Sequence, residues 1–202
     1  MCGRFVNFTT FAELQKQFAL TNNINFSASY NVAPSQEVPI IIGHEAKLAK
    51  WGYIPEWAKG KEIKPQINAR SETAHEKPFF RSGFKSRRCL VPINGFFEWQ
   101  QTTQGKQPWY FSVPGEILAI AGLYNEGTFC LLTKDADGVV SSIHDRMPVL
   151  VPQDRYGDWF TSEKEDALRL IQQCSGEALA GHKVSMKINS PANNQEALLE
   201  AV

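Results

Sequence analysis

The stretch RCLVPINGFFEW (residues 88–99) carries a strong sheet signal. Two runs rich in apolar and aromatic residues flank an Asn-Gly pair, a pattern typical of two strands that are separated by a turn. Because successive strand side chains point to opposite faces, Phe97 and Trp99 should lie on one face, with Phe96 and Glu98 on the other. The stretch therefore predicts a sheet that carries one carboxyl group among aromatic rings.

Similar β-rich runs occur on both sides of this stretch, and many are bounded by Gly, Asn, Gln or Pro. They are VPIII (38–42), PWYFSV (108–113), ILAIAGLY (117–124) and TFCLLT (128–133). The pattern predicts an α+β fold, a single domain over residues 1–202. We expect a curved, mostly antiparallel β-sheet or barrel core that is flanked by short helices.

Two helices are predicted outside the β-rich region. Thr10 and Glu13 fit a capping box, and the apolar residues that follow at helical spacing predict a short amphipathic helix over residues 10–20. Ser162 and Glu165 repeat the capping pattern before a second helix.

Gly176 is the expected stop of this second helix. A different feature is expected at residues 52–65, where the pattern favours a long surface loop. Loops of that length in compact domains are often functional.

The composition excludes several classes of protein. The chain of 202 residues has 21 basic and 21 acidic side chains, so no overall field attracts nucleic acid, and no apolar run is long enough to span a bilayer. No secretory signal is visible, and we expect a cytoplasmic location. The four cysteines form no CxxC pair, which argues against a zinc site, a redox motif or a disulfide framework, and no metal or cofactor is expected.

Cys2 would become the first residue if Met1 were removed. Its α-amine (pKa about 7.7–8.0) and its thiol (pKa about 8.5) would then be two neighbouring nucleophiles. Such a pair can attack an aldehyde to form an imine and close a thiazolidine ring, or the amine can act as base in amide hydrolysis. The alternative is a small buried residue at the start of a strand, which position alone favours.

Three other polar groups are candidates for chemistry. Asn68 and Arg70 follow a strand-like residue, although an Asn often only completes a turn. Glu98 is either a solvated carboxylate or a general acid and base whose pKa is raised by aromatic neighbours. His144 stands in a polar break beside Asp145 and Arg146, a setting that suits a titrating histidine but also a structural one.

The stretch KPFFRSGFKSRR (residues 77–88) contains five basic residues and no acid. Basic side chains could contact phosphates while Phe79, Phe80 and Phe84 stack on unpaired bases. We favour core positions for the three rings, which leaves a solvated basic face. Arg4, two residues from Cys2, could add a phosphate contact at the reactive end.

Four separated motifs occur in order: MCGRF (1–5), NARSET (68–73), GFFEW (95–99) and HDRMP (144–148). Together with YNVAPSQ, WGYIPEWAK and VSMKINSPANN, they closely resemble the SOS response-associated peptidase (SRAP) family. Members of that family crosslink to abasic sites in single-stranded DNA. The resemblance covers nearly the whole chain.

The resemblance implies a role for each motif. Processed Cys2 would attack the aldehyde of an abasic site and end as a thiazolidine DNA–protein crosslink. Asn68 would orient the reacting groups, Glu98 would be the general acid and base, and His144 would assist opening of the sugar ring. The residues implied in DNA binding are Arg4, Pro34, Trp57, Arg70, Lys77, Arg81 and Arg146, of which Pro34 and Trp57 belong to a wedge against unpaired bases.

The chain departs from the family pattern near Glu98. Many members read ADGFYEW where this chain has INGFFEW, so Asn94 replaces an acid and Phe97 replaces a tyrosine. The hydrogen bonding around Glu98 is therefore expected to differ.

Two other functions remain open at this point. The chain could be a Cys2-dependent peptidase that acts chiefly on its own Met1, or a non-covalent reader of single-stranded or modified DNA. The predicted partner is single-stranded DNA with abasic sites, bound by a monomer that associates with the nucleoid if the chain is bacterial. Replication-fork partners are unknown.

Overall fold

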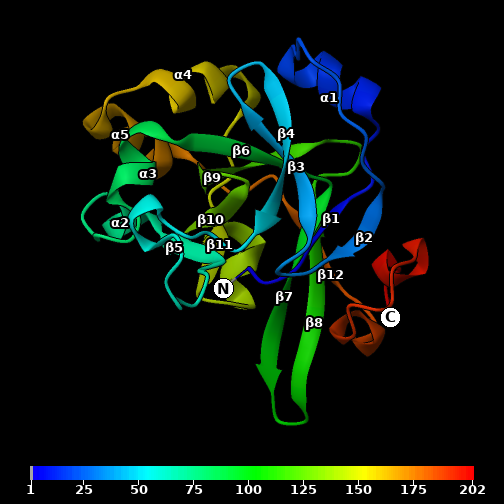
Figure 1. Ribbon diagram of the computed structural model, residues 1–202. Helices are drawn as coiled ribbons and strands as arrows, with labels where there is room; N and C mark the ends of the chain where they lie inside the picture. The colour runs from blue at the N-terminus through cyan, green and yellow to red at the C-terminus, as the bar shows by residue number, and fades with distance from the viewer. Residues whose placement is uncertain (1) are drawn as a thin grey trace.

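The computed structural model describes residues 2–202 and contains two sheets surrounded by short helices (Figure 1). One sheet has five strands in the order β12-β8-β7-β1-β2. Its strands are β1 (Phe5–Asn7), β2 (Ser29–Val32), β7 (Gly95–Thr102), β8 (Gly105–Ser112) and β12 (Ala180–Lys183).

The other sheet has seven strands and closes on itself. They are β3 (Glu37–Ile42), β4 (Glu45–Trp51), β5 (Asn68–Arg70), β6 (Arg88–Ile93), β9 (Leu118–Asn125), β10 (Thr128–Asp135) and β11 (Arg146–Pro148). Because β10 pairs with both β4 and β9, strands β4, β3, β6, β9 and β10 form a ring. The pairs of β10 with β4 and β5 are parallel and the other strand pairs are antiparallel, so the predicted α+β fold with a mostly antiparallel barrel core is confirmed.

The helices are short and cover one side of the ring (Figure 1). They are α1 (Phe11–Phe18), α2 (Ser71–Ala74), α3 (Arg81–Ser86), α4 (Tyr156–Thr161) and α5 (Lys164–Gln173), with 3₁₀ turns η1 (Glu56–Ala58), η2 (Gly138–Ser142), η3 (Gln153–Arg155), η4 (Met186–Asn189) and η5 (Glu196–Leu199). Within residues 2–202, no helix is long and apolar enough to cross a membrane.

The first predicted helix is confirmed. Thr10 caps α1, its hydroxyl accepts from the Glu13 backbone, and the Glu13 carboxylate accepts from the Thr10 backbone at 2.7 Å. Leu14 and Phe18 are buried, as the helical spacing predicts. The capping box and the apolar stripe therefore suffice to define this element.

The predicted cap and stop of the second helix are wrong. Ser162 is already the C-cap of α4, so the N-cap of α5 is Glu163, which forms no capping hydrogen bond through its side chain. The helix ends at Gln173, with Cys174 as its C-cap in extended backbone, so Gly176 plays no part in ending it. A Cβ at Gly176 would lie 2.5 Å from Cε of Met147.

The predicted strands are present, and the two faces of β7 differ as expected. Phe96 packs in a core cluster that also contains Cys2 and Phe111, whereas Phe97 packs with Val6 and Tyr110 on the opposite face. Strands β7 and β8 continue past the body of the molecule as a hairpin (Figure 1). The hairpin thus presents one face toward Cys2 and the other toward the C-terminal segment.

The basic stretch at residues 77–88 is divided between core and surface. Phe80 and Phe84 are buried and Phe79 is half-buried, in agreement with the core interpretation. Arg88 is also buried, and its guanidinium lies over the Trp159 ring. Residues 52–65 form the expected loop, with η1 as their regular segment.

Candidate active site

The predicted catalytic residues converge at the start of β1. Phe5 pairs with Phe96 in the antiparallel register of β1 and β7, which brings the residues just before β1 alongside Glu98. Asn68 begins β5, and His144 lies two residues before β11. Met1, whose removal the proposed chemistry requires, lies outside the described residues.

Cys2 is completely buried. Its Sγ atom lies 3.8 Å from the carbonyl oxygen of Arg4. Burial raises the pKa of the thiol far above its ordinary value, and the nearby carboxylate charge of Glu98 raises it further. At neutral pH the group is therefore a thiol, which needs a proton acceptor before it can act as a nucleophile.

Asn68 holds the backbone of Cys2. Its Nδ2 donates to the Cys2 carbonyl oxygen at 2.7 Å. Its Oδ1 is buried and has no hydrogen-bond partner among the described residues. A buried acceptor without a partner is unfavourable for folding, so this oxygen is available to a substrate or to the processed terminus.

Glu98 is only 2% exposed. Its strand β7 lies between β1 and β8, so it is not an edge strand, and the burial of Glu98 shows that the solvated alternative is wrong. Burial raises the pKa of its carboxyl group to about 7, with a smaller contribution from the negative charge of Asp145. The group can therefore both accept and donate a proton near neutral pH.

His144 lies next to Glu98. Its Nε2 is 3.8 Å from Oε2 of Glu98, and its Nδ1 accepts from the backbone N–H of Arg146 at 3.0 Å. Burial lowers the pKa of the imidazole. Its Nδ1 also lies 2.9 Å from Oδ1 of Asp145 and 3.2 Å from the Arg146 carbonyl oxygen, so the imidazole can carry its proton on either ring nitrogen.

Arg4 follows Cys2 by two residues, but its guanidinium lies against the C-terminal segment. Its Nη1 donates to Oδ1 of Asn31 at 2.6 Å and to the Ile188 carbonyl at 2.7 Å. Both partners are neutral, and no ion pair with Arg4 is formed within residues 2–202. A phosphate contact of Arg4, as predicted, would have to compete with these two bonds.

Arg146 is bound differently. Its side chain is 9% exposed, and its guanidinium forms ion pairs with Glu72 and Asp135 and donates to the Thr133 carbonyl. A phosphate contact, as predicted, would have to replace one of these partners. Arg70 is exposed and forms no ion pair in the described part of the chain, so it fits a phosphate contact without rearrangement.

The SOS response associated peptidase (SRAP) family model matches residues 1–191. The chain belongs to the SRAP family. Curated relatives agree: a protein of Bacillus subtilis (strain 168) named abasic site processing protein YoqW is 35% identical over 223 residues, which cover 100% of both chains.

More distant relatives span bacteria and vertebrates. Abasic site processing protein YedK of Escherichia coli (strain K12) is 27% identical, with 100% of both chains covered. Abasic site processing protein HMCES of Xenopus tropicalis is 29% identical over 88% of this chain and 67% of its own length. A crystal structure of a Bacteroides thetaiotaomicron protein matches with a TM-score of 0.88 at 24% identity over 100% of both chains, which supports the SRAP fold.

Of the two residues predicted to form a wedge in this SRAP chain, Pro34 lies half-buried in a turn and Trp57 lies in η1. Pro34 precedes Ser35, whose φ of 74° is the conformation that the third position of a type II turn requires. Trp57 is 50% exposed, its ring packs edge-on against Phe79, and Lys61 lies over it at 5.3 Å. Trp57 thus offers a supported ring surface to solvent.

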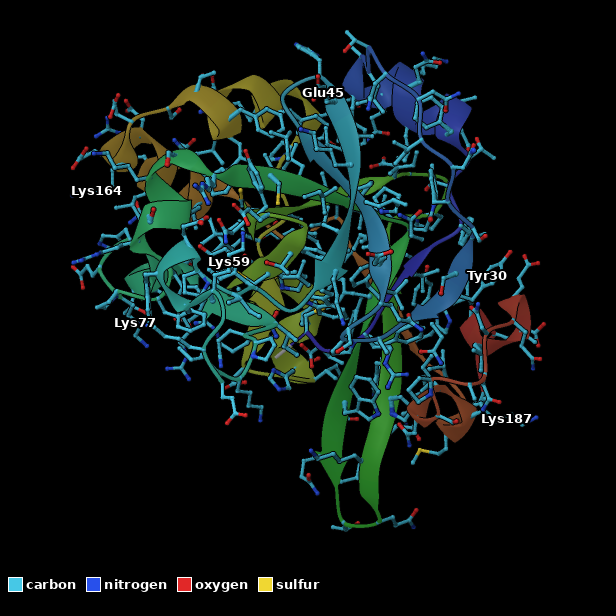
Figure 2. The ribbon with its side chains drawn as sticks, in the orientation of Figure 1. Tyr30, Glu45, Lys59, Lys77, Lys164 and Lys187 are labelled. Carbon is cyan, nitrogen blue, oxygen red and sulfur yellow. The ribbon has the colours of Figure 1, made fainter. Side chains whose placement is uncertain are left out.

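Lys77 and Arg81 are exposed but do not join the group around Cys2. Figure 2 shows Lys77 at the outer edge of the molecule, on the side of α2 and α3. Arg81 lines a separate concavity of about 520 Å³ together with Lys85 and Lys164. Their contact with DNA remains a prediction.

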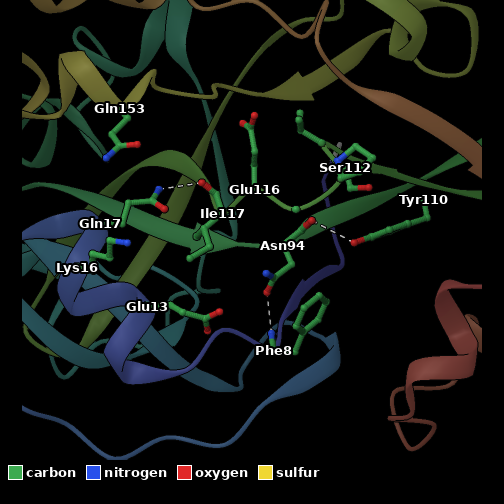
Figure 3. A pocket seen from close by; sticks show the side chains of 13 residues that line it. Phe8, Glu13, Lys16, Gln17, Asn94, Tyr110, Ser112, Glu116, Ile117 and Gln153 are labelled. Atoms are coloured by element: carbon green, nitrogen blue, oxygen red, sulfur yellow. Dashed lines mark hydrogen bonds between the residues drawn. The ribbon is translucent and has the colours of Figure 1, made fainter.

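The two residues at which this chain departs from the SRAP pattern, Asn94 and Phe97, point away from Glu98. Oδ1 of Asn94 accepts from the Phe8 backbone at 2.8 Å and from the Thr9 hydroxyl at 3.0 Å. Asn94 lines a concavity of about 840 Å³ beside α1 (Figure 3), which contains none of the predicted site residues. Phe97 is on the face of β7 opposite Glu98.

Sequence reasoning missed the residues that hold the site together. Glu72 and Asp135 pair with Arg146, and Asn31 orients Arg4. Glu72 lies within the NARSET motif, four residues after Asn68, which is the one local signal that could have drawn attention to it.

Proposed function

We propose that the chain captures abasic sites in single-stranded DNA as a thiazolidine crosslink through Cys2, after Met1 has been removed. The names of its relatives support abasic-site processing. The observation that carries the proposal is the burial of Glu98, with a pKa of about 7, beside both Cys2 and His144.

The proposed reaction proceeds in three steps. First, the sugar hemiacetal opens: its hydroxyl proton leaves, the bond from C1′ to the ring oxygen breaks, and that oxygen gains a proton from the His144–Glu98 pair. Second, the Cys2 amine attacks the aldehyde carbon, and loss of water gives an imine. Third, the thiol sulfur attacks the imine carbon while its proton moves to the nitrogen, which closes the ring.

Each proton transfer has a group suited to it. Glu98 can donate a proton to the departing hydroxide when the imine forms and accept one from the thiol, because its pKa lies near neutrality. The pKa of the Cys2 thiol is raised, so assisted proton removal is needed before sulfur attacks. We assign Oδ1 of Asn68, which is buried and has no partner among the described residues, to accept a hydrogen bond from the Cys2 amine or the lesion.

The DNA strand is proposed to bind across the adjacent surface. Arg70 supplies an exposed charge that no acid neutralises within the described residues, and Trp57 supplies an exposed ring. Arg4 would join them by exchanging the Ile188 carbonyl for a phosphate. The ring product has no imine left, which prevents strand cleavage by β-elimination. The protein would then act as a shield with slow or no turnover, as a cytoplasmic, nucleoid-associated monomer during the DNA damage response.

Intact mass spectrometry tests this proposal. Purified protein is measured before and after incubation with a single-stranded oligonucleotide that contains one abasic site. We expect loss of Met1 and a heat-stable increase by the mass of the oligonucleotide minus one water, absent in Cys2→Ala. Processed protein that stays unmodified, while an aldehyde-reactive control is labelled, would contradict the proposal.

A second candidate activity is removal of Met1 by the chain itself. The charge of Glu98 acts on the Cys2 thiol, so a base is close to the nucleophile that such a cleavage needs. Protein made by cell-free synthesis without aminopeptidase tests this activity. Loss of Met1 in wild type and its retention in Glu98→Gln would support self-processing, whereas retention in both would exclude it.

A further inference from the structure

Three residues on adjacent strands form a row that starts at Glu98. In the register of the five-stranded sheet, Glu98 of β7 lies opposite Trp109 of β8, and Trp109 lies opposite Lys183 of β12. Directly paired residues share one face of a sheet. Since strands are about 4.8 Å apart, the backbones of Trp109 and Lys183 lie about 5 and 10 Å from that of Glu98, on the Cys2 side.

The Trp109 ring is held in a defined orientation. Its Nε1 donates to Oε1 of Gln100 at 3.2 Å, and its plane lies within 14° of that of Phe111, with the ring centroids 6.4 Å apart. The side chain is half-buried, so part of the ring remains accessible. A ring that is fixed in advance loses little conformational freedom when a planar ligand stacks on it.

Lys183 lies over this ring, with Nζ 5.9 Å from the centroid. The lysine is exposed and forms no ion pair among residues 2–202. Its cation–π contact is therefore weak, because the ammonium group remains solvated. Nζ can leave the ring for an anion at its edge.

The opposite face of the same hairpin is occupied. Trp99 donates from Nε1 to Oδ1 of Asn189 at 2.8 Å, and the C-terminal segment packs over it. Figure 1 shows this segment on one side of the hairpin and the residues just before β1 on the other. Of these two tryptophans, Trp109 is the one on the Glu98 side.

We propose that Trp109 and Lys183 form a subsite for the nucleotide next to the abasic site. The base of that nucleotide stacks on the indole, and Lys183 moves from the ring to its phosphate. A ring beside an unpaired cation is the arrangement that binds unpaired bases without sequence preference. This inference rests on the proposed function, because it assigns the strand that leads to Cys2.

Crosslinking kinetics with modified flanks test the subsite. The abasic site is flanked by adenine on both sides, or by one tetrahydrofuran spacer on the 5′ or the 3′ side, which removes a single base. For wild type, we expect removal of one of the two bases to raise the half-saturating DNA concentration by about 5- to 20-fold, the lower part of the range for base stacking, because the ring is half-buried. Equal values for all three oligonucleotides would overturn the proposal.

The variants separate stacking from folding. Trp109→Leu should lose the discrimination between flanks and Trp109→Phe should keep part of it, whereas the matched control Trp99→Leu should discriminate as wild type does. Lys183→Gln, at an exposed position, should lower the slope of log affinity against log salt by about 0.7. Lys187→Gln, on the C-terminal side (Figure 2), should leave that slope unchanged. Equal effects of Trp109→Leu and Trp99→Leu, or of the two lysine changes, would contradict the subsite.

Failure of the crosslinking proposal can be recognised separately. If wild type forms no adduct, the same flank comparison is made by fluorescence anisotropy, with tetrahydrofuran at the lesion so that no aldehyde is present. A flank dependence that Trp109→Leu abolishes would support the subsite even without crosslinking. Its absence in that assay would reject the subsite.

Discussion

Arg146 donates two parallel hydrogen bonds to Glu72, from Nη1 to Oε1 at 2.7 Å and from Nη2 to Oε2 at 2.9 Å. Glu72 belongs to α2, directly after the strand that begins with Asn68, and Arg146 opens β11, two residues after His144. A bidentate pair restrains both distance and orientation. One ion pair therefore connects the segments that carry Asn68 and His144.

Glu72→Gln should weaken this connection. We expect the free energy of unfolding to fall by about 1–2 kcal/mol, less than for a fully buried pair, because the Glu72 side chain is 46% exposed and Asp135 still pairs with Arg146. Urea denaturation measures this change. Glu45→Gln, which removes an exposed pair with Lys47, should change it by less than about 0.5 kcal/mol. Equal losses in the two variants would contradict a special role for the Arg146 pair.

Arg70 and Arg146 should differ in their effects on DNA binding. Arg70→Gln should weaken binding to single-stranded DNA and lower the salt slope by about 0.7, because the exposed guanidinium is free to bind phosphate. Arg146→Gln should mainly lower stability, by about 2–4 kcal/mol, since it removes a buried guanidinium and leaves the buried Thr133 carbonyl without its donor. Anisotropy titrations at several salt concentrations check both. A lower salt slope in folded Arg146→Gln would show that Arg146 does contact phosphate.

Glu98→Gln should slow crosslinking by about 10²- to 10⁴-fold and leave DNA affinity unchanged, because the amide cannot transfer protons. Single-turnover rates on gels measure the crosslinking, and fluorescence anisotropy with uncleaved DNA measures the affinity. His144→Gln should slow the reaction less for a substrate whose aldehyde is already open than for the cyclic sugar. A wild-type rate in Glu98→Gln would remove Glu98 from the catalytic group.

The raised pKa of Glu98 also predicts how stability depends on pH. Between about 4.5 and 7, the native carboxyl group keeps a proton that the unfolded chain has lost, so the free energy of unfolding falls as pH rises through this window. The full effect is about 3 kcal/mol. As pH rises from 5 to 8, the free energy of unfolding of Glu98→Gln should therefore increase relative to that of wild type by up to this amount. Urea denaturation at both pH values measures the difference. Glu37→Gln, at an exposed position, serves as the control, and its free energy of unfolding should change with pH as that of wild type does. If the free energy of unfolding of Glu98→Gln also changed with pH as in wild type, the raised pKa of Glu98 would be contradicted.

Cys2→Ser separates the amine from the thiol. The serine variant keeps the α-amine, so it should still form an imine with an abasic site, which borohydride traps as a stable adduct. Without borohydride the adduct should be lost on heating, because serine closes no thiazolidine ring. Mass spectrometry with and without reduction makes the comparison. Wild-type adduct stability in the unreduced variant would exclude ring closure by sulfur.

The elements that were predicted correctly depend on neighbours in sequence. The capping box of Thr10 and Glu13 involves residues three apart, and the alternation that separates Phe97 from Glu98 follows from strand geometry alone. The second predicted capping box is wrong because Ser162 has another role: it is the C-cap of α4 and does not begin α5. A pattern of a few residues cannot tell whether such a serine ends one helix or begins the next.

The site depended on partners far away in sequence. Whether Glu98 was solvated or buried could not be read from its strand, because the groups beside it are Cys2 and His144, from the start of the chain and from a distant loop. Likewise, Arg146 resembled an available cation until the fold brought Glu72 against it. The family motifs indicated which residues belong together, but not which charges are free.

The sequence by itself determined the short helix at residues 11–18 and the strand pattern, because hydrogen bonds and side-chain periodicity act over a few positions. The residues predicted for the site came from the resemblance of separated motifs to the SRAP family. The tertiary structure decided the raised pKa of Glu98, the pairing of Arg146 and the row from Glu98 to Lys183. Burial and charge compensation are properties of groups that meet across strands, and only the folded chain brings those groups together.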